Sequence, residues 1–122
     1  MQIPIAYDKN AIIRFTYDGS YLICSVAGNV SVFNLLLNTL KHVSVSKVTI
    51  DDMAISVDSS ILAVCMSGGI VELYSLEDII TSNDGSINVL KSYKVKSAAL
   101  SRVLFTYRNL LLCGGRLSIA YK

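Results

Sequence analysis

The side chains best suited to metal binding or nucleophilic chemistry are three cysteines, Cys24, Cys65 and Cys113. A zinc site needs ligands at short spacings such as CxxC, whereas these cysteines lie about 40 residues apart. Each lies in an apolar run, where a free cysteine is usually part of the core. We therefore predict buried thiols in a reducing compartment, which makes the protein intracellular (cytoplasmic or nuclear), with no metal and no cofactor.

His42, the only histidine, could act as a general base only beside a nucleophile and an orienting carboxylate. Asp51 and Asp52 are the candidate carboxylates, but neighbouring strand residues point to opposite faces, so the pair cannot grip one proton or metal together. We predict that this pair lies in a loop that enters the next strand. His42 belongs to a segment of alternating polar and apolar residues, which predicts a solvated strand histidine. We expect no enzyme activity.

Glycine-containing dipeptides separate the apolar segments, and their sequence frames exclude two classes of ligand. The pairs at 68–69 and 114–115 lack the GxxxxGK[ST] frame of a phosphate-binding loop, and 83–85 lacks the spaced carboxylates of a calcium loop. Such dipeptides instead supply the positive φ angles of tight hairpins. The turn residues predicted on this basis are Asp18, Gly19, Gly28, Asp58, Gly69, Asp84, Gly85 and Gly115.

The composition indicates a folded, weakly charged domain. The 122 residues are 52% hydrophobic and 16% charged, which excludes a solvated disordered chain, and a net charge of +2 makes nucleic acid an unexpected partner. Residues 19–40 carry no charge over about a transmembrane length, but six serines and asparagines and the turn signal at 28–29 interrupt the run. We expect no membrane partner, and the N-terminus has no signal-peptide pattern.

One sequence pattern occurs twice, at 15–24 and at 105–113: Phe-Thr-Tyr, then a turn, then an apolar run that ends in cysteine. It belongs to three similar units, 11–35, 52–76 and 101–122. Each unit reads as a strand, a polar turn, an apolar strand, a glycine turn and a strand of alternating polarity. A duplicated phrase embedded in a duplicated unit indicates a repeat architecture.

The period of the repeat is about 40 residues. Asp18 and Asp58 are 40 residues apart, and Gly28 and Gly69 are 41 apart. A fourth strand, at about 40–45 and about 87–93, completes each of the first two units. Four short antiparallel strands in each unit of about 40 residues are typical of a propeller blade. The predicted fold class is all-β, with antiparallel four-stranded blades.

The units resemble the WD-repeat β-propeller family. The family's Ser-Pro-Asp-Gly-like turn is similar to 16–19 and 56–59, and its Asp-Gly-x-Val-x-Ile-Trp-Asp segment is similar to 28–35, to 69–76 and, more faintly, to 115–121. The family's Trp-Asp pair is replaced by Phe33-Asn34, Tyr74-Ser75 and Ala120-Tyr121, and its Gly-His is absent. The Asp-His-Ser-Trp network associated with the family therefore cannot form as such.

We predict one partial propeller over 1–122, with blades at about 11–45 and 52–93, an incomplete blade at 98–122, and 1–7 as an outer strand of a preceding blade. Closed propellers have about four to eight blades, so the end blades would expose apolar faces. The chain could be a segment of a longer protein, or complete a ring with another chain or with copies of itself. A compact barrel or sandwich is the remaining alternative.

The resemblance implies a non-catalytic protein–protein interaction scaffold, a propeller segment of a larger protein or multi-subunit complex with other proteins as partners. The alternative is a small self-associating β-protein that completes a propeller or sheet with copies of itself or with another chain. Recognition in propellers uses loops and exposed basic and aromatic side chains. The predicted interaction surface comprises Lys91, Tyr93, Lys94, Lys96, Arg102 and Arg108, with the linker 77–86.

Overall fold

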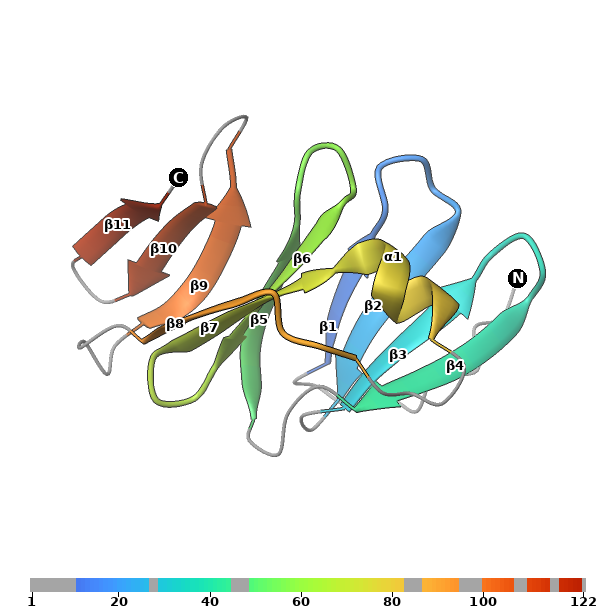
Figure 1. The fold of residues 1–122 in the computed structure, drawn as a ribbon, viewed down its shortest axis with the longest axis horizontal. Helices are drawn as coiled ribbons and strands as arrows, with labels where there is room; N and C mark the ends of the chain where they lie inside the picture. Colours follow the sequence, from blue (N-terminus) through green and yellow to red (C-terminus); the bar gives the residue numbers. More distant parts are fainter. Residues whose placement is uncertain are drawn as a thin grey trace.

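The fold was analysed in a computed structural model, which describes residues 11–26, 29–44, 49–82, 87–94, 100–106, 110–114 and 117–121. The predicted turn residues Gly28, Asp84, Gly85 and Gly115, the basic residues Lys96 and Arg108, and the segment 1–7 lie outside these ranges. The described strands form three antiparallel sheets, each ordered as in the sequence. Figure 1 shows them fanned side by side in chain order as an open arc.

Two of the sheets have four strands and the third has three. The first blade contains β1 (Ile12–Phe15), β2 (Tyr21–Val26), β3 (Asn29–Asn34) and β4 (Thr39–Ser44). The second blade contains β5 (Ile50–Ile55), β6 (Ile61–Met66), β7 (Ile70–Ser75) and β8 (Lys91–Lys94). The third sheet contains β9 (Leu100–Phe105), β10 (Leu110–Gly114) and β11 (Leu117–Tyr121).

The main apolar core lies between the first and second blades. Alternation along β3 turns Val30 and Val32 toward the second blade, where both are buried. The second blade meets them with larger side chains, among them Met53, Leu62 and Tyr74. The buried members of this cluster are Ile23, Val30, Val32, Val43, Ile50, Met53, Ile55, Leu62, Val64, Met66, Tyr74, Leu76 and Ile79.

A smaller core joins the second blade to the third sheet. The second blade contributes small side chains, Ala54, Ala63 and Cys65, which allow the neighbouring sheet to approach closely. Val103 of β9 is buried against them, and Phe105 packs at the edge of the cluster. The second blade is thus covered on both faces, which explains why β6 is buried at five of its six positions.

Asp52 links all three sheets through its buried carboxylate. Arg14 of β1 donates from Nη2 to Oδ1 at 2.8 Å, and the backbone N–H of Met53 donates to the same oxygen at 2.9 Å. The backbone N–H of Val103 in β9 donates to Oδ2 at 2.9 Å. Arg14 also donates from Nε to the Met53 carbonyl at 2.9 Å. The prediction that Asp51 and Asp52 lie in a loop is wrong, because both belong to β5.

A short helix, α1 (Leu76–Thr81), occupies part of the predicted linker 77–86, and β8 begins at Lys91, later than expected. Ser75 caps the helix by accepting from the Asp78 N–H at 3.3 Å. Lys41 of the first blade donates from Nζ to the carbonyls of Ile80 and Ser82 at the other end. The helix therefore forms a further bridge between the first two blades.

We predict that Asp52→Asn lowers the free energy of unfolding by about 2–4 kcal/mol. The substitution removes the charge that pairs with Arg14 and replaces one carboxylate oxygen by an NH₂ group, which cannot accept the hydrogen bond made there. Urea unfolding followed by circular dichroism measures the change. Asp51→Asn is the matched control, since no hydrogen bond or ion pair involves its side chain among the described residues. Equal stability of the two variants would contradict the role given to Asp52.

Candidate functional site

The turn after β1 is built around the carboxylate of Asp18. Its Oδ1 accepts hydrogen bonds from Thr16 Oγ1 at 2.7 Å, Ser20 Oγ at 2.7 Å and the Ser20 N–H at 3.0 Å. Gly19 adopts a φ of 75°, a conformation that glycine enters without steric cost. One carboxylate oxygen thus organises the whole reversal between β1 and β2.

The turn after β5 repeats this arrangement around Asp58. Its Oδ1 accepts from Ser56 Oγ at 2.8 Å, Ser60 Oγ at 2.6 Å and the Ser60 N–H at 3.0 Å. Ser59 takes the place of the glycine, with a φ of 60°. The repeat seen in the sequence is therefore also a repeat of side-chain chemistry.

Both turns hold a carboxylate in its charged form. Hydrogen bonds from Ser20 and Thr16 lower the pKa of Asp18 from its usual 3.8 to about 2. Hydrogen bonds from Ser60 and Ser56 likewise lower the pKa of Asp58 from 3.8 to about 2. Each turn therefore carries a fixed negative charge at every physiological pH.

The two turns lie side by side at one end of the blades. The backbone N–H of Tyr17 donates to Ser59 Oγ at 3.1 Å and so joins them. The residue before each aspartate is apolar and points into solvent, with Tyr17 66% and Val57 45% exposed. The turn between β3 and β4 reaches the same end, and its Leu36 is 87% exposed. This end of the molecule therefore combines negative charge with exposed apolar side chains.

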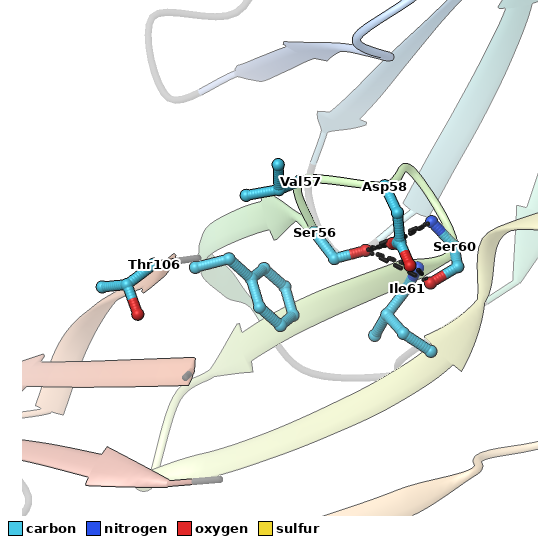
Figure 2. A pocket seen from close by; sticks show the side chains of 7 residues that line it. Ser56, Val57, Asp58, Ser60, Ile61 and Thr106 are labelled. Carbon is cyan, nitrogen blue, oxygen red and sulfur yellow. Dashed lines mark hydrogen bonds between the residues drawn. The ribbon is translucent and has the colours of Figure 1, made fainter. Parts of the chain in front are cut away.

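A pocket of about 480 Å³ opens where the second blade meets the third sheet. Its polar wall is the hydrogen-bonded group of Ser56, Asp58 and Ser60, which Figure 2 shows close together. The remaining lining residues are Val57, Ile61, Phe105 and Thr106. The sequence did not indicate this pocket, because it forms only when the end of β9 packs beside the turn that follows β5.

The predicted basic and aromatic residues are distributed over separate elements. Lys91 Nζ lies 5.1 Å from the ring centroid of Tyr93, a cation–π contact on β8. Alternation turns Lys94 to the other face of this strand. Arg102 is exposed on β9, the first strand of the third sheet. The structure thus brings Lys91 and Tyr93 together but does not place Lys94 on their face.

Cys24 and Cys65 are buried and His42 is exposed on a strand, as the sequence predicted, while the side chain of Cys113 lies outside the description. Cys24 and Cys65 are buried free thiols, and burial, with the nearby charges of Asp51 and Asp52, raises the pKa of Cys65 to about 11. His42 is exposed, with Nδ1 2.8 Å from Ser31 Oγ. Within the described ranges, no group of three or more His, Cys, Asp or Glu side chains is arranged to hold a metal ion. In the same ranges, no helix is long and apolar enough to span a membrane.

We predict that Ser60→Ala raises the pKa of Asp58 toward 3.8 and leaves that of Asp18 at about 2, because Ser60 makes the main hydrogen bonds to Asp58. A lowered pKa in the folded state stabilises the protein above pH 3.8, and this contribution is lost as the pH falls from 3.8 to about 2. The difference in stability between wild type and Ser60→Ala should therefore shrink over that interval.

Carboxyl ¹³C NMR titration measures the two pKa values, and urea unfolding at pH 5 and pH 2 measures the stabilities. Ser67→Ala, at the opposite end of the blades, is the control and should change neither pKa. An Asp58 that titrates near 3.8 in the wild-type protein would contradict the arrangement described for this turn.

No protein-family model and no curated protein matches this sequence. The fold nevertheless resembles a chain of the mitotic checkpoint complex, with a TM-score of 0.69 and 15% identity over 84% of this chain and 29% of that chain. It also resembles the β-propeller domain of Myceliophteria thermophila Cps50 (Swd1), with a TM-score of 0.65 and 13% identity over 90% of this chain and 38% of that one.

Both of these neighbours are WD40 β-propellers, and the chain matches well under half of the length of each. At this level of identity the likeness concerns the fold. It confirms the predicted all-β class and the resemblance to WD-repeat propellers, and it excludes the barrel and sandwich alternatives for the described strands. The fold is that of a partial β-propeller, two four-stranded blades followed by a three-stranded sheet.

Proposed function

We propose that this chain is a non-catalytic protein–protein interaction scaffold, a propeller segment of a larger intracellular protein or multi-subunit complex. The observation that carries the proposal is the uneven distribution of exposed apolar side chains. Among the described residues, exposed large hydrophobics gather in the β1–β2, β3–β4 and β5–β6 turns at one end of the blades, and we call this the apolar end. Its turns expose Tyr17, Leu36, Leu37 and Val57.

The described turn residues at the opposite end of the blades differ in character. They include Thr49, Ser67 and Gly68, with the Ser67 N–H donating to the Thr49 carbonyl at 3.0 Å. None of the exposed large hydrophobics of the described chain lies in these turns. Clusters of exposed apolar side chains surrounded by polar residues are typical of protein interaction sites. Loops held by a rigid sheet scaffold also commonly carry the residues that bind partners. The apolar end is therefore the proposed binding end.

The neighbouring folds support protein partners in general. One of them is part of a mitotic checkpoint complex, an assembly of several proteins. A second contact surface remains a proposal at Lys91, Tyr93, Lys94, Lys96, Arg102 and Arg108. Among them Lys91, Lys94 and Arg102 are exposed, and such basic side chains suit the polar rim of an interface.

Removal of two exposed leucines tests the proposal. We predict that Leu36→Ser combined with Leu37→Ser reduces recovery of specific partner proteins by roughly tenfold or more in quantitative affinity purification, because apolar anchors supply most of the energy of such contacts. Thr49→Ala at the opposite end is the control and should retain every partner. Unchanged partner recovery with the double variant, measured at equal stability, would contradict the assignment of the apolar end.

Self-association is the second candidate function, and exposed apolar side chains on β1 and β9 favour it. Ile12 and Arg14 of β1 point toward the second blade, so Ile13 and Phe15 point away from it, and Phe15 is 57% exposed. Leu104 is similarly exposed on β9, on the face away from the second blade. In an assembly of copies, these exposed apolar side chains would pack against one another.

If copies associate through these faces, size-exclusion chromatography with light scattering should give an oligomer for the wild-type chain and a monomer for Phe15→Asp. Tyr17→Asp is the matched control, because Tyr17 lies in the turn and not on the sheet face; it should keep the wild-type mass. A monomeric wild-type chain would exclude this second function.

A further inference from the structure

The pocket between the second blade and the third sheet has two chemically different walls. Asp58, with Ser56 and Ser60, forms a polar wall at the turn after β5. Ile61 and Phe105, both half-buried, form an apolar wall. A ligand that fills the pocket must therefore present an apolar surface on one side and a complementary polar group on the other.

The carboxylate of Asp58 has one occupied and one open oxygen. Oδ1 accepts the three hydrogen bonds from Ser56 and Ser60, which fix the group in place. Oδ2 accepts none from another residue of the described chain, and Asp58 has no ion-pair partner there. A carboxylate can accept about four hydrogen bonds, so this pocket-lining group retains acceptor capacity.

We propose that this pocket binds a cationic side chain, arginine or lysine, from a partner polypeptide. The methylene stem would pack against Ile61 and Phe105, and the charged head would donate to Oδ2 of Asp58, with the aromatic ring adding a cation–π attraction. The inference deepens the proposed scaffold function and rests on it, since the side chain belongs to a protein partner.

The junction between the first and second blades, at the turn of Asp18, is the equivalent place one repeat earlier. Asp18 accepts hydrogen bonds from Thr16 and Ser20 in the pattern that Asp58 makes with Ser56 and Ser60. The residue that corresponds to Phe105 in the repeat is Ile55, which is buried. The turn at Asp18 is also tied to the next blade by the bond from the Tyr17 N–H to Ser59 Oγ. The two aspartates therefore share their chemistry while only Asp58 lies beside an aromatic wall, which makes Asp18 the matched control.

Amide NMR of the 122-residue chain, titrated with N-acetyl-arginine amide at constant ionic strength, tests the proposal. We expect saturable shifts at the amides of Ser60 and Phe105. Asp58→Asn should weaken binding by about two- to fivefold, as for a single exposed ion pair, whereas Asp18→Asn should leave it unchanged. N-acetyl-norleucine amide, which keeps an apolar stem without the charge, should bind more weakly than the arginine probe.

Phe105→Leu is an independent test, because it keeps an apolar side chain in the pocket wall, removes the aromatic ring and leaves the turn at Asp58 unchanged. It should also weaken binding of the arginine probe. If Asp58→Asn does not fold, the result for Phe105→Leu decides the test. Any of three results would overturn the pocket proposal. The norleucine and arginine probes could bind equally well, Asp58→Asn and Asp18→Asn could change binding equally, or the arginine probe could cause no saturable shift. The scaffold proposal is tested separately at Leu36 and Leu37, so partner recovery that survives a failed arginine titration would overturn the pocket alone.

Discussion

The buried carboxylate of Asp52 is the constraint on which the arrangement of the three sheets depends. A buried charge is costly unless it is paired and hydrogen-bonded, and here the donors come from different sheets. Arg14 belongs to β1 and the N–H of Val103 to β9, so the carboxylate is satisfied only when both neighbours stand in their observed register. The apolar cores on either side of the second blade drive the stacking, while Asp52 specifies how the sheets align.

That alignment also determines which surfaces remain for binding. Stacking brings the turns at Asp18 and Asp58 together at one end, where the Tyr17 N–H bonds to Ser59 Oγ. It places β9 beside the turn of the preceding blade and so forms the pocket lined by Asp58 and Phe105. The strands form the packed core, and the connecting segments stay exposed for binding partners, as expected of a repeat scaffold.

Much of the fold could be predicted from the sequence, because a period of two and recurrent turn residues are local signals. Phe33 and Tyr74, at the positions of the family's tryptophan, are indeed buried. Features that depend on distant partners could not be predicted. An aspartate is not expected in a buried strand, and Asp52 lies there only because it pairs with Arg14, 38 residues away in the sequence. The Ser75 cap and the spacing of Leu76 and Ile79 were an available signal for α1, but a six-residue helix is easily read as a loop.

The most direct test of this account is a nuclear Overhauser measurement on the isotopically labelled chain, focused on the Val103 amide proton. Packing of the third sheet on the second blade places that proton against the carboxylate of Asp52, 51 residues earlier in the sequence. We predict a cross-peak between the Val103 amide proton and the β-protons of Asp52, with slow solvent exchange of that amide. A Val103 amide that exchanges freely and shows no contact with Asp52, while the strand pairings within each sheet persist, would contradict the stacked arrangement.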